Sequence, residues 1–363
     1  MNAITPRTAL ICGISGQDGA YLAQLLLAQG YRVIGTARDA QMSSFASLQR
    51  LGIRGQVTVE SMAINDFRSV LQVLSRHAPA EVYNLAGQSS VGLSFDQPVE
   101  TLESISVGTL NLLEVIRFLN RDIRFYNAGS GECFGDTGDT PADENTPFHP
   151  RSPYAVAKAA AYWQVANYRE AYGLFACSGI LFNHESPLRP ERFVTQKIVR
   201  AACRIAAGSP ERLQLGNLDI QRDWGWAPEY VDAMWRMLQQ PTPQDYVIAT
   251  GKTRPLQDFV AEAFGAVGLN WQDHVATDPD LVRPADVRIS GANPALAAAR
   301  LGWTAQTRMS GVVQRMVQAS QDAASQPAHV AGAMQHLGNL GQGTELGVPL
   351  GQAIGNGRDG SVS

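Results

Sequence analysis

The sequence has few cysteines, no excess of basic charge and no long uncharged apolar run. Its four cysteines lie far apart without metal-binding spacing, which predicts free thiols, a reducing compartment and no metal site. Acidic residues outnumber basic residues by 33 to 29, for a net charge of -4, so we expect neither a nucleic-acid partner nor an anionic membrane partner. No apolar run approaches a membrane span, and the first residues lead directly into a strand rather than a signal peptide. We therefore expect a cytoplasmic protein.

Short apolar runs alternate with helical patterns through the first half of the chain. The composition, 45% hydrophobic and 17% charged over 363 residues, is typical of a globular protein with one large domain and a smaller lobe. The alternation indicates βαβ units and a parallel sheet with helices on both faces, a doubly wound α/β fold of the Rossmann type. We predict strands at 8–12, 31–37, 57–63, 81–86, 123–128 and 175–182, and helices at 19–29, 67–77, 107–119 and 153–172.

The pattern becomes irregular after residue 182, where proline, arginine and tryptophan are dense. We interpret 1–182 as the dinucleotide-binding domain and 183–324 mainly as a smaller α+β lobe for the substrate. One strand near 245–249 is expected to return to the sheet. Glycine, glutamine, alanine and serine dominate 325–363 without periodicity, which predicts a flexible tail. Within the lobe, the pattern predicts helices at 256–267 and 295–301.

A glycine-rich turn, Gly13-Ile14-Ser15-Gly16-Gln17-Asp18-Gly19, lies between the first predicted strand and the first predicted helix. Glycines allow a tight turn and let backbone N–H groups approach a pyrophosphate at the helix N-terminus. Such turns also occur for packing reasons, but strand, spacing and helix agree here, which favours dinucleotide binding. We expect Asp18 to cap the helix or to bond loop amides rather than to meet the phosphates.

The second predicted strand ends in Arg38 followed by Asp39. An arginine at this strand end suits the 2′-phosphate of NADP, whereas an acidic residue suits the ribose hydroxyl of NAD. Arg38 comes first and favours NADP as the cofactor. Asp39 keeps NAD open, and a solvated Arg38–Asp39 surface pair is a third interpretation.

Tyr154 and Lys158 are four residues apart on a predicted helix and therefore share one face. There the ammonium group favours the phenolate and lowers the tyrosine pKa toward the range of a general base. Tyrosine and lysine meet at this spacing on many helices. Ser130, at the end of the adjoining predicted strand, adds a hydroxyl that can align a substrate alcohol. With the glycine turn in the same chain, the set indicates hydride transfer from an alcohol.

Glu132 follows Ser130 by two residues. A glutamate in a loop is usually just solvated. Beside a hydride-transfer site, however, a carboxylate can remove the proton alpha to a newly formed ketone, a proton that becomes acidic only after oxidation. Glu132 therefore predicts an elimination step that a simple dehydrogenase does not need.

Several sequence blocks resemble the GDP-mannose 4,6-dehydratases, members of the extended short-chain dehydrogenase/reductase group. They include GISGQDGAYLAQLLLAQGY, NLAGQSSVGLSFDQP, SPYAVAKAAAYW, NHESP followed by FVT.KI, GNLD..RDWG and VRPADV. The resemblance runs from about residue 8 to residue 303. It implies a lyase that makes GDP-4-dehydro-6-deoxy-mannose from GDP-mannose, recycles its NADP and forms a homo-oligomer, a dimer or a tetramer.

The resemblance also implies a role for each matching residue. Tyr154 would be the base for the C4 hydroxyl, Lys158 its partner and a ribose ligand, Ser130 the aligning hydroxyl, and Glu132 the base for the C5 proton. The residues that would contact NADP are Gly13, Gly16, Gln17, Asp18, Gly19, Arg38, Ser89, Tyr154 and Lys158. The residues that would hold the GDP-sugar are Asn183, Glu185, Val194, Lys197, Gly216, Arg222 and Arg283.

The sequence departs from the family pattern at two places that bear on function. The catalytic turn reads Ala128-Gly129-Ser130-Gly131-Glu132, and its two glycines are expected to loosen it. The loop after Arg38 lacks the arginines that reach a neighbouring subunit in the family, which weakens the expectation of a tetramer. Two other readings stay open: a related GDP-sugar reductase or epimerase, and a non-catalytic nucleotide sensor.

Overall fold

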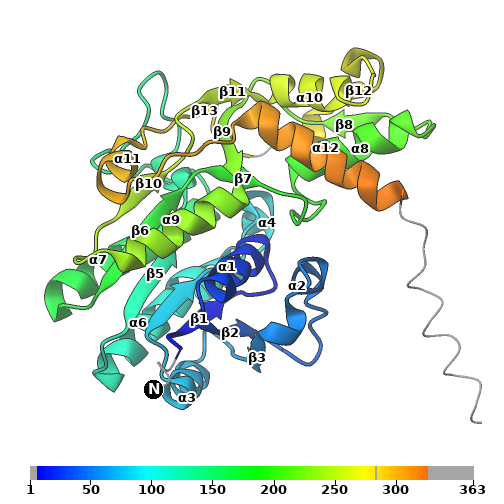
Figure 1. The fold of residues 1–363 in the computed structure, drawn as a ribbon. Coiled ribbons are helices and arrows are strands. Elements are labelled where there is room, and N and C mark those ends of the chain that lie inside the picture. Colours follow the sequence, from blue (N-terminus) through cyan, green and yellow to red (C-terminus); the bar gives the residue numbers. More distant parts are fainter. Residues whose placement is uncertain (1–5, 283, 326–363) are drawn as a thin grey trace, which may run out of the picture. The chain divides into compact units, whose positions relative to one another are not determined.

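Parallel strands form the central sheet of the computed structural model, which describes residues 6–282 and 284–325 (Figure 1). The strands are β1 (Thr8–Cys12), β2 (Arg32–Ala37), β3 (Thr58–Ser61), β4 (Glu81–Asn84), β5 (Arg124–Ala128), β6 (Ala176–Leu181) and β10 (Tyr246–Ile248). Their order is β10-β6-β5-β4-β1-β2-β3, so the chain builds outward from β1 and then reverses at β4. Ligands of such sheets bind at the carboxyl ends beside this reversal. The predicted doubly wound α/β fold is confirmed.

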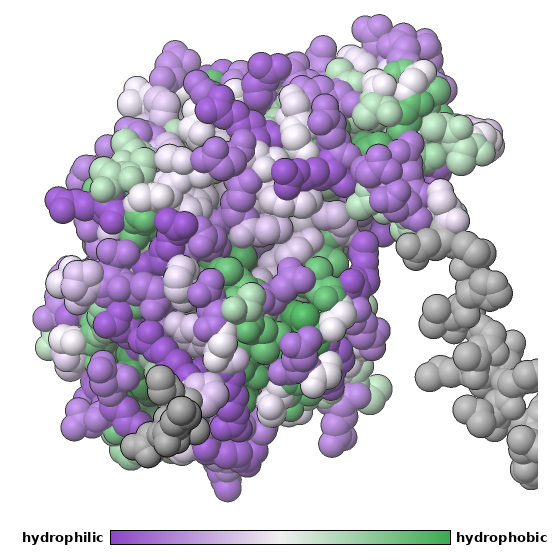
Figure 2. All heavy atoms as spheres, in the orientation of Figure 1, coloured by the Kyte–Doolittle hydropathy of each residue, from purple (hydrophilic) through white to green (hydrophobic). Residues whose placement is uncertain are grey.

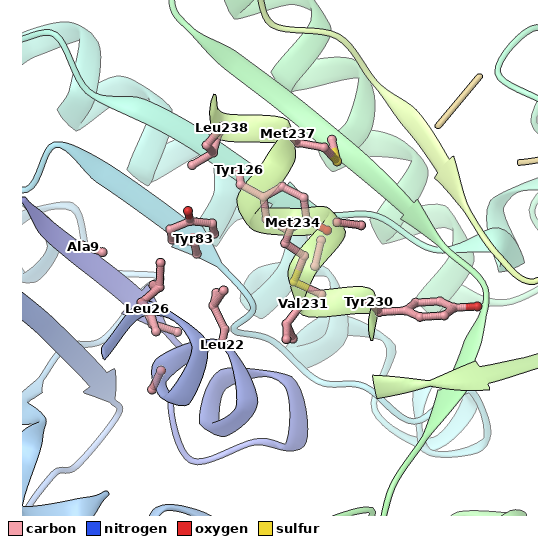
Figure 3. Packing of buried hydrophobic residues seen from close by; sticks show 14 of the residues in the cluster. Ala9, Leu22, Leu26, Tyr83, Tyr126, Tyr230, Val231, Met234, Met237 and Leu238 are labelled. Atoms are coloured by element: carbon pink, nitrogen blue, oxygen red, sulfur yellow. The ribbon is translucent and has the colours of Figure 1, made fainter. Parts of the chain in front are cut away.

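One face of the sheet is covered by α1 (Gln17–Ala28) and α9 (Ala227–Gln239). Figure 3 shows Leu22 of α1 and Met234 of α9 packing against Tyr83 and Tyr126 of the sheet. Because β1 is buried on both faces from Ala9 onward, it reads as a continuous apolar run rather than an alternating one. The space-filling view shows a mostly hydrophilic surface, with a hydrophobic patch where α1 lies in Figure 1 (Figure 2).

Three helices cover the other face of the sheet: α3 (Phe67–His77), α6 (Gly108–Leu119) and α7 (Pro153–Tyr172). The longest of them, α7, begins where the Ser152 side chain accepts a hydrogen bond from the Ala155 amide. It ends at Gly173 in the left-handed conformation. These two boundaries fix the helix that carries the predicted Tyr–Lys pair.

Two smaller sheets lie outside the central sheet, and the part of the chain after residue 182 that forms them is called the smaller lobe below. The first has the order β11-β9-β13 with β7 paired to β9, and the second pairs β12 with β8. The helices α8, α10 and α12 pack around Trp224 and Phe259 to form a separate hydrophobic core. The elements are β7 (Asn183–Glu185), α8 (Val194–Ala206), β8 (Leu213–Leu215), β9 (Gln221–Trp226), β11 (Thr253–Pro255), α10 (Leu256–Gly265), β12 (Val275–Thr277), β13 (Ile289–Ser290) and α12 (Met309–Ser325). The helix α11 (Ala295–Leu301) instead packs beside β10 and α9 in the core of the central sheet.

The elements predicted at 8–12, 67–77, 153–172 and 295–301 have the predicted bounds in the structure. The other predicted elements are present with ends shifted by a few residues. The sequence prediction missed α8, α9 and α12, and it missed several short helical segments elsewhere in the chain. These segments are α2 (Ala46–Arg50), α4 (Val91–Asp96), α5 (Pro98–Leu102), the π-helical turn η2 (Glu103–Val107), and the 3₁₀ turns η1 (Arg54–Gln56), η3 (Gly131–Phe134), η4 (Trp271–Asp273) and η5 (Pro279–Leu281).

The missed helix α9 shows why irregular composition misleads. Its buried side chains Tyr230, Val231, Met234, Met237 and Leu238 recur with helical spacing, yet it lies in the part of the chain interpreted as irregular, and no helix was predicted there. Proline at a first helical turn is favourable and does not break the helix. The predicted tail lies outside the described residues except for Ser325, where α12 ends. None of the described helices is long and apolar enough to cross a membrane.

Candidate active site

The glycine-rich turn packs so closely that side chains would not fit at two of its positions. Gly13 has a φ of +83°, and a Cβ there would lie 2.8 Å from the carbonyl oxygen of Leu85 after β4. A Cβ at Gly19 would lie 2.5 Å from the carbonyl oxygen of Gly13. These contacts hold the turn against the sheet and point the N-terminus of α1 outward, which is the arrangement that receives a phosphate.

A cavity of about 700 Å³ opens in front of this turn, at the carboxyl ends of β1, β2 and β4. It brings together the residues that the sequence analysis assigned to the cofactor, apart from Tyr154 and Lys158. The assigned residues that line it are Gly13, Gly16, Gln17, Asp18, Gly19, Arg38 and Ser89. Arg189 and Arg192 also line it, from the loop between β7 and α8, and the sequence analysis did not assign them to the cofactor.

Ser130, Tyr154 and Lys158 form the predicted catalytic cluster. The Ser130 hydroxyl hydrogen-bonds to the phenol of Tyr154. The Lys158 ammonium donates to the Ala128 carbonyl oxygen at 2.8 Å and lies 5.8 Å from the centre of the Tyr154 ring. The helix α7 and the end of β5 thus place a hydroxyl, a phenol and an ammonium together, as the sequence analysis predicted.

Burial governs the protonation of this cluster. It lowers the pKa of Lys158 to about 8 because a charged ammonium loses water contacts. It also raises the pKa of Tyr154, and the hydrogen bond from Ser130 offsets only part of that rise. The sequence analysis expected Lys158 to lower the pKa of Tyr154, but the net shift in the structure is upward, because desolvation of the phenolate is the largest cause.

Glu132 sits in the 3₁₀ turn that follows β5, and its amide donates to the Ser130 hydroxyl at 3.2 Å. Its carboxylate lies 4.0 Å from the guanidinium of Arg222, which is also 3.5 Å from Asp286. A Cβ at Gly131 would lie 2.9 Å from the Phe182 ring. The turn is therefore tightly packed, and the expectation that its glycines loosen it is wrong.

A buried bridge connects the glycine-rich turn to β7 of the smaller lobe. The Asp18 carboxylate lies 2.8 Å from Nε2 of His184, whose Nδ1 lies 2.7 Å from the Phe182 carbonyl oxygen. Gln17 accepts from the Ser186 hydroxyl at 2.7 Å and donates to the His184 carbonyl oxygen at 3.2 Å. The Asp18 side chain makes no helix cap, so that part of the expectation is wrong, but its Oδ1 accepts from the side-chain amide of Gln17 in the same turn at 3.0 Å.

The bridge pairs an imidazolium with a carboxylate, because both ring nitrogens of His184 face acceptors. Burial alone would lower the pKa of His184, but the charge and hydrogen bond of Asp18 and the bond to Phe182 outweigh it and raise that pKa. Burial would likewise raise the pKa of Asp18, but the charge and hydrogen bond of His184 lower it. The sequence analysis assigned no role to His184.

The residues assigned to the GDP-sugar lie in the smaller lobe. Glu185 is almost fully buried, pairs with Arg189 at 3.2 Å and accepts from Thr195 at 2.8 Å. Lys197 donates to the Gln214 carbonyl oxygen at 2.7 Å. Asn183 begins β7, Val194 begins α8, Gly216 approaches the backbone of Leu281, and Arg222 contacts Glu132. Arg283 lies outside the described residues.

A family model and curated relatives give one and the same family. The family model described as GDP-mannose 4,6 dehydratase matches residues 10–316. The chain is 45% identical to GDP-mannose 4,6 dehydratase 1 of Arabidopsis thaliana over 86% of its length and 90% of the relative's. It is also 45% identical to the GDP-mannose 4,6-dehydratase of Sinorhizobium fredii, over 86% and 95% of the two chains.

Solved structures share the fold at lower sequence identity. The UDP-glucose 4-epimerase of Thermotoga maritima with UDP-glucose matches with a TM-score of 0.78 at 21% identity, over 87% of this chain and 99% of that one. The dTDP-glucose 4,6-dehydratase of Bacillus anthracis with NAD matches with a TM-score of 0.77 at 18% identity, over 87% and 97%. These likenesses concern the fold alone.

The His184–Asp18 bridge predicts a pH-dependent contribution to stability. The substitution His184→Gln leaves Asp18 without its counter-charge and should lower the free energy of unfolding by roughly 3 kcal/mol. The difference in the free energy of unfolding between the wild type and the variant is full below the unfolded histidine pKa of about 6.5. It is lost as pH rises through the higher pKa of His184 in the folded protein. At the acid end it is lost as pH falls through the lowered folded pKa of Asp18.

Urea unfolding of the wild type and of His184→Gln across this pH range tests the bridge. The substitution His149→Gln, at an exposed histidine, is the matched control and should leave stability nearly unchanged at every pH. Equal stability of His184→Gln and the wild type near pH 6 would contradict the ion pair.

Proposed function

Because the chain belongs to the GDP-mannose 4,6-dehydratase family, we infer that it converts GDP-mannose to GDP-4-dehydro-6-deoxy-D-mannose with loss of water. It is an NADP-dependent hydro-lyase, and the hydride taken from the sugar is returned to it, so no net redox change occurs. The observation that carries the assignment is the cluster of Ser130, Glu132, Tyr154 and Lys158 in a chain so similar to these relatives.

We propose that the cavity in front of the glycine-rich turn holds NADP. The close packing at Gly13 and Gly19 leaves room for a pyrophosphate at the N-terminus of α1. Arg38 at the end of β2 suits the 2′-phosphate, and Ser89 lines the same cavity. When bound, NADP supplies the acceptor for the hydride and later its donor. In this proposal residues 1–182, with β10, serve the cofactor, and 183–324 mainly serve the GDP-sugar.

Tyr154 acts as the base for the C4 hydroxyl of the hexose. Its hydrogen bond with Ser130 supports this role, since the serine can hold the same hydroxyl in line. Burial keeps the phenol protonated in the free protein, so positive charge is needed to release its proton. Lys158, close to the Tyr154 ring, provides one such charge.

Glu132 removes the C5 proton once C4 is a ketone, and the C6 hydroxyl then leaves as water. The neighbouring ketone makes that proton acidic enough for a carboxylate base. The short turn between Ser130 and Glu132 supports the role, because it ties the second base to the group that aligns the first. The same carboxyl group, protonated by this step, can then give its proton to the departing hydroxyl.

The GDP part of the substrate is assigned to the smaller lobe. Arg222 is nearly buried beside Glu132, where its guanidinium can hold a phosphate close to the catalytic turn. Lys197 and Gly216 lie near β8, on either side of Gln214. Asn183, Glu185, Val194 and Arg283 complete the proposed set, as the family resemblance implies.

We also propose that the protein forms a homo-oligomer through α5 and α7. These helices pack beside each other and expose large apolar side chains: Val99 at 68%, Leu102 at 43%, Val156 at 47% and Trp163 at 62%. An apolar surface shared by two adjacent helices is typical of an interface between identical subunits.

The conversion itself is tested with purified enzyme and GDP-mannose in the absence of added reductant. NMR should show a 4-keto-6-deoxy sugar, while the absorbance of reduced nicotinamide shows no net change. Stoichiometric consumption of NADPH would instead identify a reductase. Unchanged sugar with the cofactor bound would contradict the proposed substrate.

The substitution Glu132→Gln should separate oxidation from elimination. Without the base for C5, the 4-keto sugar and enzyme-bound NADPH should accumulate, and turnover should fall by about 100-fold or more. Single-turnover absorbance and exchange of the C5 proton with deuterium measure the two steps. The control Tyr154→Phe should form neither ketone nor NADPH, and a normal elimination rate in Glu132→Gln would remove Glu132 from the mechanism.

The oligomer is tested by Trp163→Glu, which places a charge in the exposed apolar surface of α7. We expect its molar mass in light scattering to fall toward that of the monomer, because burying an unpaired carboxylate at an interface is unfavourable. Circular dichroism checks that the exposed substitution leaves the fold intact. An unchanged molar mass would place the interface elsewhere.

A further inference from the structure

An acidic side chain faces Arg38 across the mouth of the cofactor cavity. Glu100, on α5, lies with its Oε1 atom 3.2 Å from Nη2 of Arg38. Both side chains line the cavity, and both are more than half exposed. The arginine assigned to the 2′-phosphate is therefore already paired with a carboxylate that arrives from a different part of the chain.

The acidic residue next to Arg38 in the sequence, Asp39, forms hydrogen bonds within its own loop. The Oδ1 atom of Asp39 accepts hydrogen bonds from the amides of Gln41 at 2.9 Å and Met42 at 3.1 Å. This oxygen shapes the loop after β2. The carboxylate that contacts the Arg38 guanidinium is that of Glu100, which the sequence analysis did not single out.

A carboxylate at this position affects the two possible cofactors differently. The 2′-phosphate of NADP carries a charge of about -1.5 to -2, and Arg38 cannot serve it fully while paired with Glu100. The ribose of NAD carries no such charge, and a carboxylate can accept a hydrogen bond from its 2′-hydroxyl. The exposed ion pair is itself weak, so either cofactor can displace it.

We propose that Glu100 is a specificity-determining residue that reduces the preference of this enzyme for NADP over NAD by competing with the 2′-phosphate for Arg38. This inference rests on the proposed cofactor site and adds to it a residue on α5. It makes the balance between NADP and NAD a property of the Arg38–Glu100 pair rather than of the β2 end alone.

The substitution Glu100→Gln should strengthen NADP binding and leave NAD binding unchanged or slightly weaker. Removing one charge near the phosphate in an exposed setting should lower the dissociation constant for NADP by about three- to tenfold at low salt. The effect should shrink at high salt, where exposed charges are screened. Titration calorimetry of nucleotide-free enzyme with each cofactor measures the ratio of the two dissociation constants.

The matched control is Glu103→Gln, because Glu103 also lines the cavity but has no ion pair with Arg38 among the described contacts. An unchanged ratio in Glu100→Gln, or an equal change in Glu103→Gln, would overturn the proposal. A second test repeats Glu100→Gln in an Arg38→Gln background, where competition for Arg38 is absent and the effect should diminish. An undiminished effect would show that Glu100 acts without Arg38.

Measurements on the wild type show whether a negative result concerns this inference or the proposed function. If the wild type converts GDP-mannose and binds NADP, an unchanged ratio of the two dissociation constants in Glu100→Gln contradicts only the role of Glu100. If the wild type neither binds NADP nor converts GDP-mannose, the proposed function itself fails. Because the Glu100 side chain is half exposed, thermal unfolding should show that the variant remains folded.

Discussion

The common direction of the central strands is the constraint on which the site depends. Every strand of the sheet is parallel, so the loops that follow β1, β4, β5 and β6 all emerge at one edge. The glycine-rich turn, Ser89 and Ser130 lie in those loops, and Asn183 begins β7 just after β6, although these residues are far apart in the sequence. The packing of Gly13 onto Leu85 then draws the first two loops together. The rest of the site is built on that edge.

Charge balance at this edge follows from the His184–Asp18 bridge. A free carboxylate at the start of α1 would repel a pyrophosphate bound to the same N-terminus. The imidazolium of His184 neutralises it and also connects the cofactor turn to β7, the strand that carries Asn183 and Glu185. One buried ion pair thereby neutralises an unfavourable charge and holds the cofactor turn against β7.

The sequence was sufficient for features that depend on local pattern. The strand at 8–12, the helix at 153–172 and the Tyr154–Lys158 spacing follow from periodicity, capping and turn residues over short stretches. The helix α9 was missed although its apolar spacing is regular, because the chain after residue 182 was interpreted as irregular. Ion pairs such as Asp18–His184 and Arg38–Glu100 join residues far apart in the chain, so no local pattern could reveal them.

The Tyr154–Lys158 pair shows where local reasoning about chemistry also reaches its limit. Spacing on a helix correctly placed the ammonium beside the phenol, but burial, which a sequence does not display, reverses the expected direction of the phenol's pKa. The same burial lowers the pKa of Lys158 to about 8, so at neutral pH most of the ammonium remains charged. The lysine can therefore still favour a phenolate and donate hydrogen bonds.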